Sequence, residues 1–156
     1  MVDLPDVLWK MYDNHITHGR HHETQRSTIA GLILAVATAL LGVASIDKEL
    51  TGPFDALVGA ALVGLGLFGA GFALKQSERW DLHMERARRF RNALDDELGG
   101  KLKMLKEAAD ENHEAANPYL HKMRLRVWWI GLNFAVSVVG LVVILFALRV
   151  AATTAP

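Results

Sequence analysis

Several residue types and motifs are missing from this chain of 156 residues, and each absence excludes a class of function. The chain contains no cysteine, which excludes disulfide frameworks, thiol catalysis and Cys-ligated metal sites. Its formal net charge is +0, so no global electrostatic attraction draws it to nucleic acid. No Gly-rich phosphate loop, HExxH motif or nucleophile elbow occurs. We therefore expect a protein that is not an enzyme, has no cofactor and does not bind nucleic acid directly.

Charge is also missing from three long apolar runs, 27–46, 56–74 and 127–148. An α-helix rises ~1.5 Å per residue, so roughly 20 apolar residues cross the ~30 Å hydrocarbon core of a bilayer. The sequence therefore predicts an all-α membrane protein with three transmembrane helices. We place a transmembrane hairpin over 27–75, with its two spans at 27–46 and 54–75. The third span covers 121–149, and a short tail, 150–156, follows it.

Lys and Arg are distributed unevenly around these runs. Fifteen of the 17 lie in 1–26 and 75–126, and the other two are Lys48 and Arg149. Segments rich in Lys and Arg remain on the cytoplasmic side of a membrane. We therefore expect a cytoplasmic N-terminus, a cytoplasmic segment between the second and third spans, and a C-terminus on the outside.

The charged segments have the patterns of helices outside the membrane. Residues 1–26 predict an amphipathic helix, because apolar residues recur at helical spacing: Leu4, Leu8 and Met11. Residues 76–120 predict a cytoplasmic antiparallel helical hairpin between the second and third spans. Its first arm carries an apolar stripe of Trp80, Met84, Ala87 and Leu94. The first arm ends at Gly99–Gly100 and the second at Asn117–Pro118. Because no proline interrupts 54–98, the second span should continue into this arm as one long helix.

Small residues recur in the first two spans, at Gly31, Ala35, Ala39, Gly64 and Ala70. Helices in lipid associate largely by the close backbone approach that small residues permit. We expect these two spans to pack closely as antiparallel neighbours joined by a tight turn at 47–53. Since the second span has small residues on more than one face, we also expect a homo-oligomer.

The third span carries a polar and small stripe, Asn133, Ser137 and Gly140, at i, i+4 and i+7. Polar groups at membrane depth are costly when they face lipid, so they should face protein or water. One interpretation is that the stripe lines a pore across an oligomer. The other is that it makes hydrogen bonds between helices within one chain.

Four arginines lie within six residues: Arg86, Arg88, Arg89 and Arg91. Guanidinium groups match phosphate geometry, so this cluster could receive a phosphate-bearing ligand such as a nucleotide signal, or a cytoplasmic protein partner. Salt bridges to neighbouring acidic residues, Glu85, Asp95 and Asp96, are the alternative.

Histidines are concentrated before the first span, and His15, His18 and His22 share one helix face. Histidine ligates metals and titrates near neutral pH, so the face could bind a metal or sense pH. The alternative is a polar helix near the membrane whose histidines form hydrogen bonds or face water.

The order of these features resembles a known family. A polar helix, HITHGRHHETQRS, leads into a tight two-span hairpin whose second span continues into a charged helix, LKQSERWDLHMERARRFRNALDDE. In this layout residues 12–98 resemble the SLATT-type small membrane effector proteins of bacterial conflict and defence systems, while the third span extends beyond their two-span core. The resemblance implies a multi-pass protein of the bacterial inner (plasma) membrane that forms pores when a partner senses infection.

Three functions fit the sequence. The first is an oligomeric inner-membrane protein that forms or gates a pore, as an anti-phage defence effector controlled through its cytoplasmic hairpin. The second is a non-conducting anchor or scaffold that docks a cytoplasmic partner. The third is a holin-like phage protein.

Overall fold

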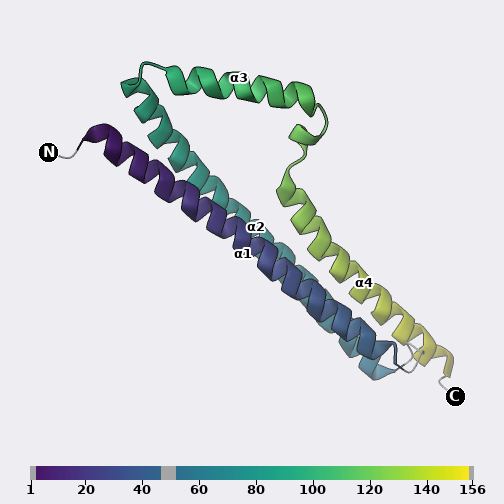
Figure 1. Ribbon diagram of the computed structural model, residues 1–156. Helices are drawn as coiled ribbons and strands as arrows, with labels where there is room; N and C mark the ends of the chain where they lie inside the picture. Colours follow the sequence, from purple (N-terminus) through teal and green to yellow (C-terminus); the bar gives the residue numbers. More distant parts are fainter. Residues whose placement is uncertain (1–2, 47–51, 155–156) are drawn as a thin grey trace. The chain divides into compact units, whose positions relative to one another are not determined.

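A computed structural model describes residues 3–46 and 52–154 of the chain (Figure 1). These residues form four α-helices and one short 3-10 helix, and they contain no strand. The elements are α1 (Leu4–Ala44), α2 (Pro53–Glu97), α3 (Lys101–Ala116), η1 (Leu120–Lys122) and α4 (Leu125–Thr154). The predicted all-α class is confirmed. Three helices, α1, α2 and α4, are long and apolar enough to cross a membrane, as predicted.

The chain divides into two compact units. Unit 1 comprises Met1–Thr24 and Gln76–Leu125, and unit 2 comprises Gln25–Lys75 and Arg126–Pro156. The three apolar runs belong to unit 2, whereas 26 of the 34 charged residues belong to unit 1. Helices α1 and α2 each contribute residues to both units.

Helix α1 joins two predicted segments, 1–26 and 27–46, into one helix of 41 residues. Gly19 lies within this continuous helix and has a packing role. A Cβ atom at Gly19 would overlap the end of the Met84 side chain of α2 and lie 3.7 Å from Trp80 Cδ1. The missing side chain therefore lets α1 approach α2 closely within unit 1.

Helix α2 is a single helix of 45 residues, in agreement with the long helix predicted over 54–98. Pro53 occupies its first turn, where the missing N–H is tolerated. The buried Asp55 carboxylate accepts a hydrogen bond of 3.0 Å from the Gly52 N–H, which fixes the start of the helix. Most of the tight turn predicted at 47–53 lies outside the described residues, as does the end of the predicted tail.

Helix α2 ends at the predicted break, where Gly99 and Gly100 have φ of 70° and 80°. Left-handed backbone is a conformation that glycine adopts without strain. The carboxylate of Asp95 then accepts hydrogen bonds of 2.8 and 3.1 Å from the N–H groups of Leu102 and Lys103, which caps the start of α3.

Helix α3 ends at Ala116, before the predicted break at Asn117–Pro118. It has no buried residue, and Met104 and Leu105 are about 70% exposed, at 69% and 70%. Figure 1 shows α3 leaving the end of α2 at an angle. The predicted antiparallel hairpin of 76–120 is therefore not confirmed as a packed helix pair.

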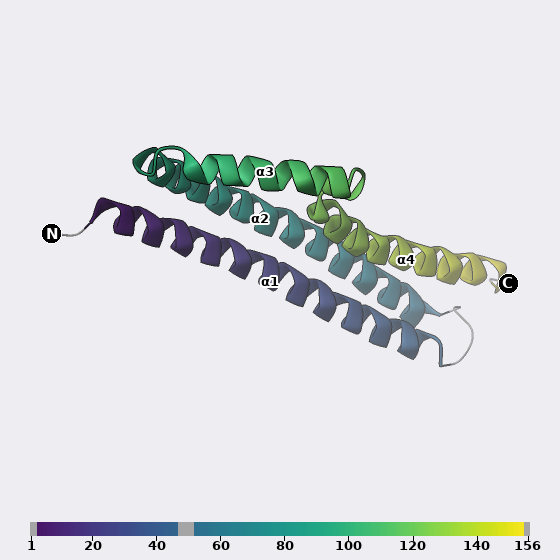
Figure 2. The same ribbon diagram turned by 45° about the horizontal axis from the view of Figure 1, so that its top comes forward.

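Unit 2 is a bundle of apolar helix segments with its core between them. Figures 1 and 2 show α4 running alongside α2 in this unit. The core cluster consists of Ala37, Ala44, Val58, Leu62 and Val136, with Leu62 fully buried. Large apolar side chains cover the outside, among them Leu32, Leu67, Phe68, Leu145 and Phe146. Water-soluble proteins rarely expose such extensive apolar surface, whereas a lipid-facing surface requires it.

Candidate functional site

Helices α2 and α4 of unit 2 meet along a seam of glycines, Gly59, Gly66, Gly69 and Gly140. A Cβ at Gly59 would lie 2.8 Å from the carbonyl oxygen of Gly140, and one at Gly140 would lie 2.6 Å from that of Gly59. A Cβ at Gly66 would lie 2.6 Å from both Asn133 O and Ser137 N. Contacts this short leave no space for a side chain, so the two backbones touch directly.

The polar stripe of the third span faces this seam. Asn133 and Ser137 are 2% and 3% exposed. Ser137 Oγ donates a hydrogen bond of 3.2 Å to the carbonyl oxygen of Val63 on α2, and Asn133 Nδ2 donates one of 2.8 Å to Trp129 O on its own helix. All three predicted residues, Gly140 included, therefore lie between α2 and α4. Within one chain, the polar groups of this stripe therefore take part in the packing of α4 on α2.

The small residues predicted to pack the first two spans lie mostly on the outer surface. Gly31, Ala35, Ala39 and Gly64 are exposed, and Ala70 is half-buried. A Cβ at Gly31 or Gly64 would meet nothing within 4 Å. Within the chain, α1 instead buries Ala30, Ile33, Ala37 and Ala44. Within one chain, the first two spans therefore pack mainly through other residues than the five that the sequence singled out.

Histidines from two helices of unit 1 converge on His83 of α2. The ring centroids of His15, His18 and His22 lie 5.3, 5.1 and 5.3 Å from that of His83. The Nδ1 atoms of His15 and His83 are 3.1 Å apart, so the Nδ1–H of one ring donates a hydrogen bond to the Nδ1 of the other, which must be neutral. We call these four residues, His15, His18, His22 and His83, the histidine cluster.

Two contacts fix the edges of the histidine cluster. His22 Nδ1 lies 2.7 Å from Gln76 Oε1, and since an amide oxygen only accepts, His22 donates this hydrogen bond. The ring of Phe90 stacks on His15 with centroids 5.6 Å apart and an interplanar angle of 15°. The sequence pattern on α1 indicated three members of the cluster, but it did not indicate His83, which comes from the other helix.

Burial and positive neighbours lower the pKa values of two members. Burial has the largest effect on the pKa of His15, followed by the positive charge of Arg86 and by His18. Burial also lowers the pKa of His83 most, and His22, His15, His18 and Arg86 lower it further. Both pKa values fall below the ordinary 6.5. Both imidazoles are therefore neutral at pH 7.

A metal ion finds no complete ligand set in this arrangement. Among residues 3–46 and 52–154, no group of three or more His, Cys, Asp or Glu side chains is placed to hold one ion. The metal interpretation of His15, His18 and His22 therefore gains no support from the geometry.

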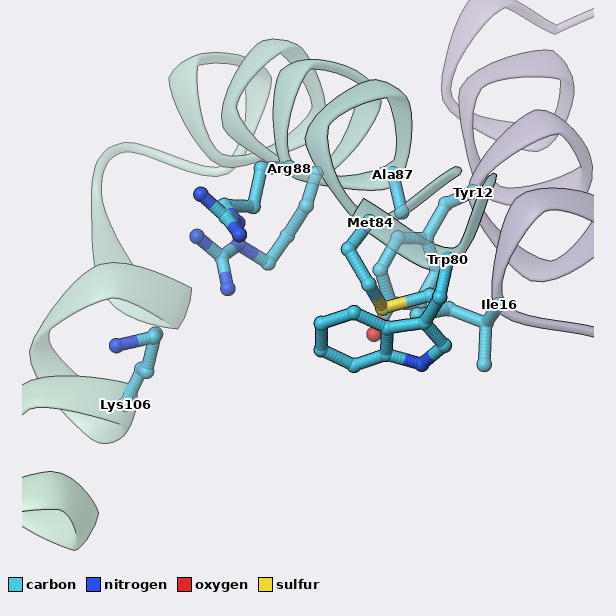
Figure 3. A pocket seen from close by; sticks show the side chains of 8 residues that line it. Tyr12, Ile16, Trp80, Met84, Ala87, Arg88 and Lys106 are labelled. Atoms are coloured by element: carbon cyan, nitrogen blue, oxygen red, sulfur yellow. The ribbon is translucent and has the colours of Figure 1, made fainter. Parts of the chain in front are cut away.

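The four predicted arginines divide between two sides of α2. Arg86 and Arg89 lie beside His15 and Phe90, in a hollow lined also by Leu8, Met11 and Ala93. Arg88 and Arg91 lie in a different cavity, of about 220 Å³, together with Lys106 of α3. Figure 3 shows the basic groups Arg88 and Lys106 on one side of this cavity, and Trp80, Met84, Tyr12 and Ile16 on the other.

Three of these arginines, Arg88, Arg89 and Arg91, have hydrogen-bond partners. Glu85 accepts hydrogen bonds of 3.4 Å from Arg88 Nη1 and 3.2 Å from Arg89 Nε, and Arg91 Nη2 donates one of 3.3 Å to Asn92. The Glu85 pairs are half-exposed or more, so each contributes little to stability. The intramolecular alternative predicted for this cluster is therefore present for Arg88 and Arg89, with Glu85 as the acidic partner.

No known protein family, curated protein or solved structure matched this chain. The SLATT-type resemblance therefore stays a prediction from layout.

Proposed function

We propose that the protein is an oligomeric membrane protein that forms or gates a pore, with unit 1 as the part that receives a controlling signal. In this proposal unit 2 lies in the bacterial inner membrane, and unit 1 and the N-terminus lie in the cytoplasm. The distribution of Lys and Arg supports that orientation, and the layout shared with SLATT-type effectors supports a role in anti-phage defence.

The observation that carries the proposal is the outer face of α1 in unit 2. Small or weakly polar residues recur there every three or four positions, and all are exposed: Thr28, Gly31, Ala35, Thr38, Gly42 and Ser45. Lipid tails are as apolar as side chains, so an outward stripe of small residues favours association with another helix. The intrachain contacts use a different face, so this stripe remains available to a second copy.

The same stripe supplies polar groups that could face a lumen. Thr38 Oγ1 donates a hydrogen bond of 2.8 Å to Leu34 O, and Ser45 Oγ donates one of 2.8 Å to Gly42 O. A hydroxyl that donates to its own helix can still accept a hydrogen bond from water. Because Asn133 and Ser137 are buried against α2, α1 is a better candidate than α4 for lining a water-filled path.

Liposome leakage by the purified full-length protein tests this proposal. We expect the wild-type protein to release a small encapsulated dye and to form oligomers that chemical cross-linking captures. The double variant Gly31→Leu with Ala35→Leu should lose both properties, because branched side chains prevent close helix approach. Its matched control, Val36→Leu on the exposed part of the same helix, should retain both.

A non-conducting anchor or scaffold is the second candidate. It is favoured by the burial of Asn133 and Ser137, which leaves α4 with an apolar outer surface. If the assembled wild-type protein never releases dye, with or without the product of a neighbouring gene, the pore proposal is wrong. Oligomers that persist without leakage would then support the scaffold, and the holin-like alternative would fall with the pore.

A further inference from the structure

The histidine cluster brings together four titratable side chains that the proposed function does not use. They come from two helices of unit 1, and three of the rings surround the fourth at centroid distances of 5.1 to 5.3 Å. The cluster joins α1 to α2 directly, through the His15–His83 contact of 3.1 Å and the His22–Gln76 hydrogen bond of 2.7 Å. The protonation state of these rings therefore bears on how α1 is held.

The His15–His83 contact requires at least one neutral ring. Its two Nδ1 atoms share a single proton, with one donor and one acceptor. When both rings are protonated, each Nδ1 carries a hydrogen, so the hydrogen bond is replaced by a repulsive contact between two positive charges. Protonated His18 and His22 would add like charges around His83.

Charged groups of both signs lie near the cluster in the sequence or in space. Arg86 of α2 acts on both His15 and His83, and Arg89 lines the same hollow as His15. The nearest carboxylates in sequence are Asp13 and Glu23 on α1 and Asp81 and Glu85 on α2, and they would favour the charged form of histidine. Burial and Arg86 oppose that form, and their effect prevails for His15 and His83, whose pKa values are lowered.

These lowered pKa values determine how stability depends on pH. At a pH between the folded and unfolded pKa values of these histidines, the unfolded chain binds more protons than the folded one. The contribution of the cluster to stability is therefore complete above about pH 6.5, the ordinary histidine pKa. It decreases as the pH falls below that value, towards the folded pKa values.

We propose that the histidine cluster is a proton-operated contact that holds the start of α1 against α2 at neutral pH and releases it on acidification. Tyr12 and Ile16 of α1 and Trp80 and Met84 of α2 line one cavity, and their packing limits how far the helices separate. The proposal concerns unit 1 alone, so it can succeed or fail independently of pore formation.

Distance measurement between spin labels tests the proposal on the full-length protein in lipid nanodiscs. The chain has no cysteine, so Asn14→Cys and Asn92→Cys introduce the only labelling sites, both exposed and one on each helix. We expect one short distance at pH 8 and a several-fold larger population of longer distances at pH 5.5. Carboxylates with ordinary pKa values of about 4 remain ionised at both pH values.

Three variants separate the cluster from other titrating groups. His83→Gln cannot be protonated and should lose most of the response to pH. His113→Gln alters a histidine of α3 outside the cluster and should respond as the wild type does. His83→Lys carries a fixed charge and should show the longer distances already at pH 8.

Two results would overturn the proposal. One is an unchanged distance distribution in the wild type between pH 8 and pH 5.5. The other is a full response retained by His83→Gln. Because His83→Gln keeps a polar side chain of similar size and adds no charge, the conclusion does not depend on whether His83→Lys folds.

Discussion

Glycine has different roles at different positions in this chain. At Gly66 and Gly69 of unit 2 the missing side chain permits direct contact with α4, and at Gly99 and Gly100 it permits a left-handed backbone. At Gly64, two residues before Gly66, a side chain would meet nothing within 4 Å. The effect of a substitution therefore depends on the individual glycine, although Gly64, Gly66 and Gly69 lie in the same apolar run.

Substitutions in the glycine seam test this difference. Gly66→Ala should destabilise the α2–α4 contact by about 1–3 kcal/mol, because the added methyl group collides with the α4 backbone. Gly64→Ala should change stability by less than about 0.5 kcal/mol, since exposed substitutions are usually near neutral. Unfolding in mixed detergent micelles measures both. Equal effects of the two variants would contradict the seam.

The sequence could not distinguish Gly64 from Gly66 and Gly69, because all three fall within one apolar run, 56–74. Hydrophobic periodicity does not reveal which side of a helix faces a neighbour when both protein and lipid are apolar. The prediction therefore chose Gly31, Ala35 and Ala39 on α1, which lie on the outer face. A polar residue gave a better signal: Ser137 had to face protein or water, and it faces α2.

At the scale of helices, Asp95 connects the end of α2 to the start of α3. Its carboxylate accepts two backbone hydrogen bonds from α3, and the residue is only 7% exposed. Helix α3 has no buried residue. Its first turn therefore depends on this cap more than on packing.

Removal of the cap should loosen the start of α3. Asp95→Ala should destabilise it by about 0.5–2 kcal/mol, the usual range for loss of a cap. Hydrogen exchange at Leu102 and Lys103 should accelerate accordingly. Asp96→Ala is the matched control, because Asp96 is the exposed neighbour and should leave this exchange unchanged. If both variants behave alike, Asp95 is not the cap.

Helix boundaries were the most predictable part of the fold. Proline and glycine placed the ends of α2 and α3 within a residue or two, because those residues restrict the backbone locally. The apolar stripe of α2 was also right at Ala87 and Leu94, which are buried. The pairing of His15 with His83 depends on how α1 and α2 align, and a helix pattern within one segment cannot give that. Residues 15 and 83 are equally far from residue 49 in the sequence, so an antiparallel helix pair whose turn is centred there would place His15 opposite His83.

At the scale of the molecule, the two units differ in how their segments are held. Unit 2 has a contiguous apolar core and a seam of backbone contacts. In unit 1, α3 has a capped start and no buried residue. Segments with few buried contacts open with the smallest free energy. We therefore expect α3 to be the first helix of unit 1 to unfold.

Limited trypsin digestion checks this order of opening. In detergent at neutral pH, the first cuts should fall in α3, at Lys101, Lys103 and Lys106. Cleavage after the buried Arg26 in unit 2 should be much slower, and mass spectrometry of early fragments distinguishes the two. Equally rapid cleavage at both places would show that α3 has no lower local stability.

The glycine seam also determines which movements unit 2 can make. Sliding α4 along α2 by one turn, ~5.4 Å, would bring Leu141 and Ile144 into the places of Ser137 and Gly140. Those places have no room for larger side chains, since a Cβ at Gly140 already lies 2.6 Å from the carbonyl oxygen of Gly59. Within unit 2, helix α4 therefore has a single register on the apolar segment of α2. Any opening of an assembled pore would then occur at the boundaries between copies, where α1 faces outward.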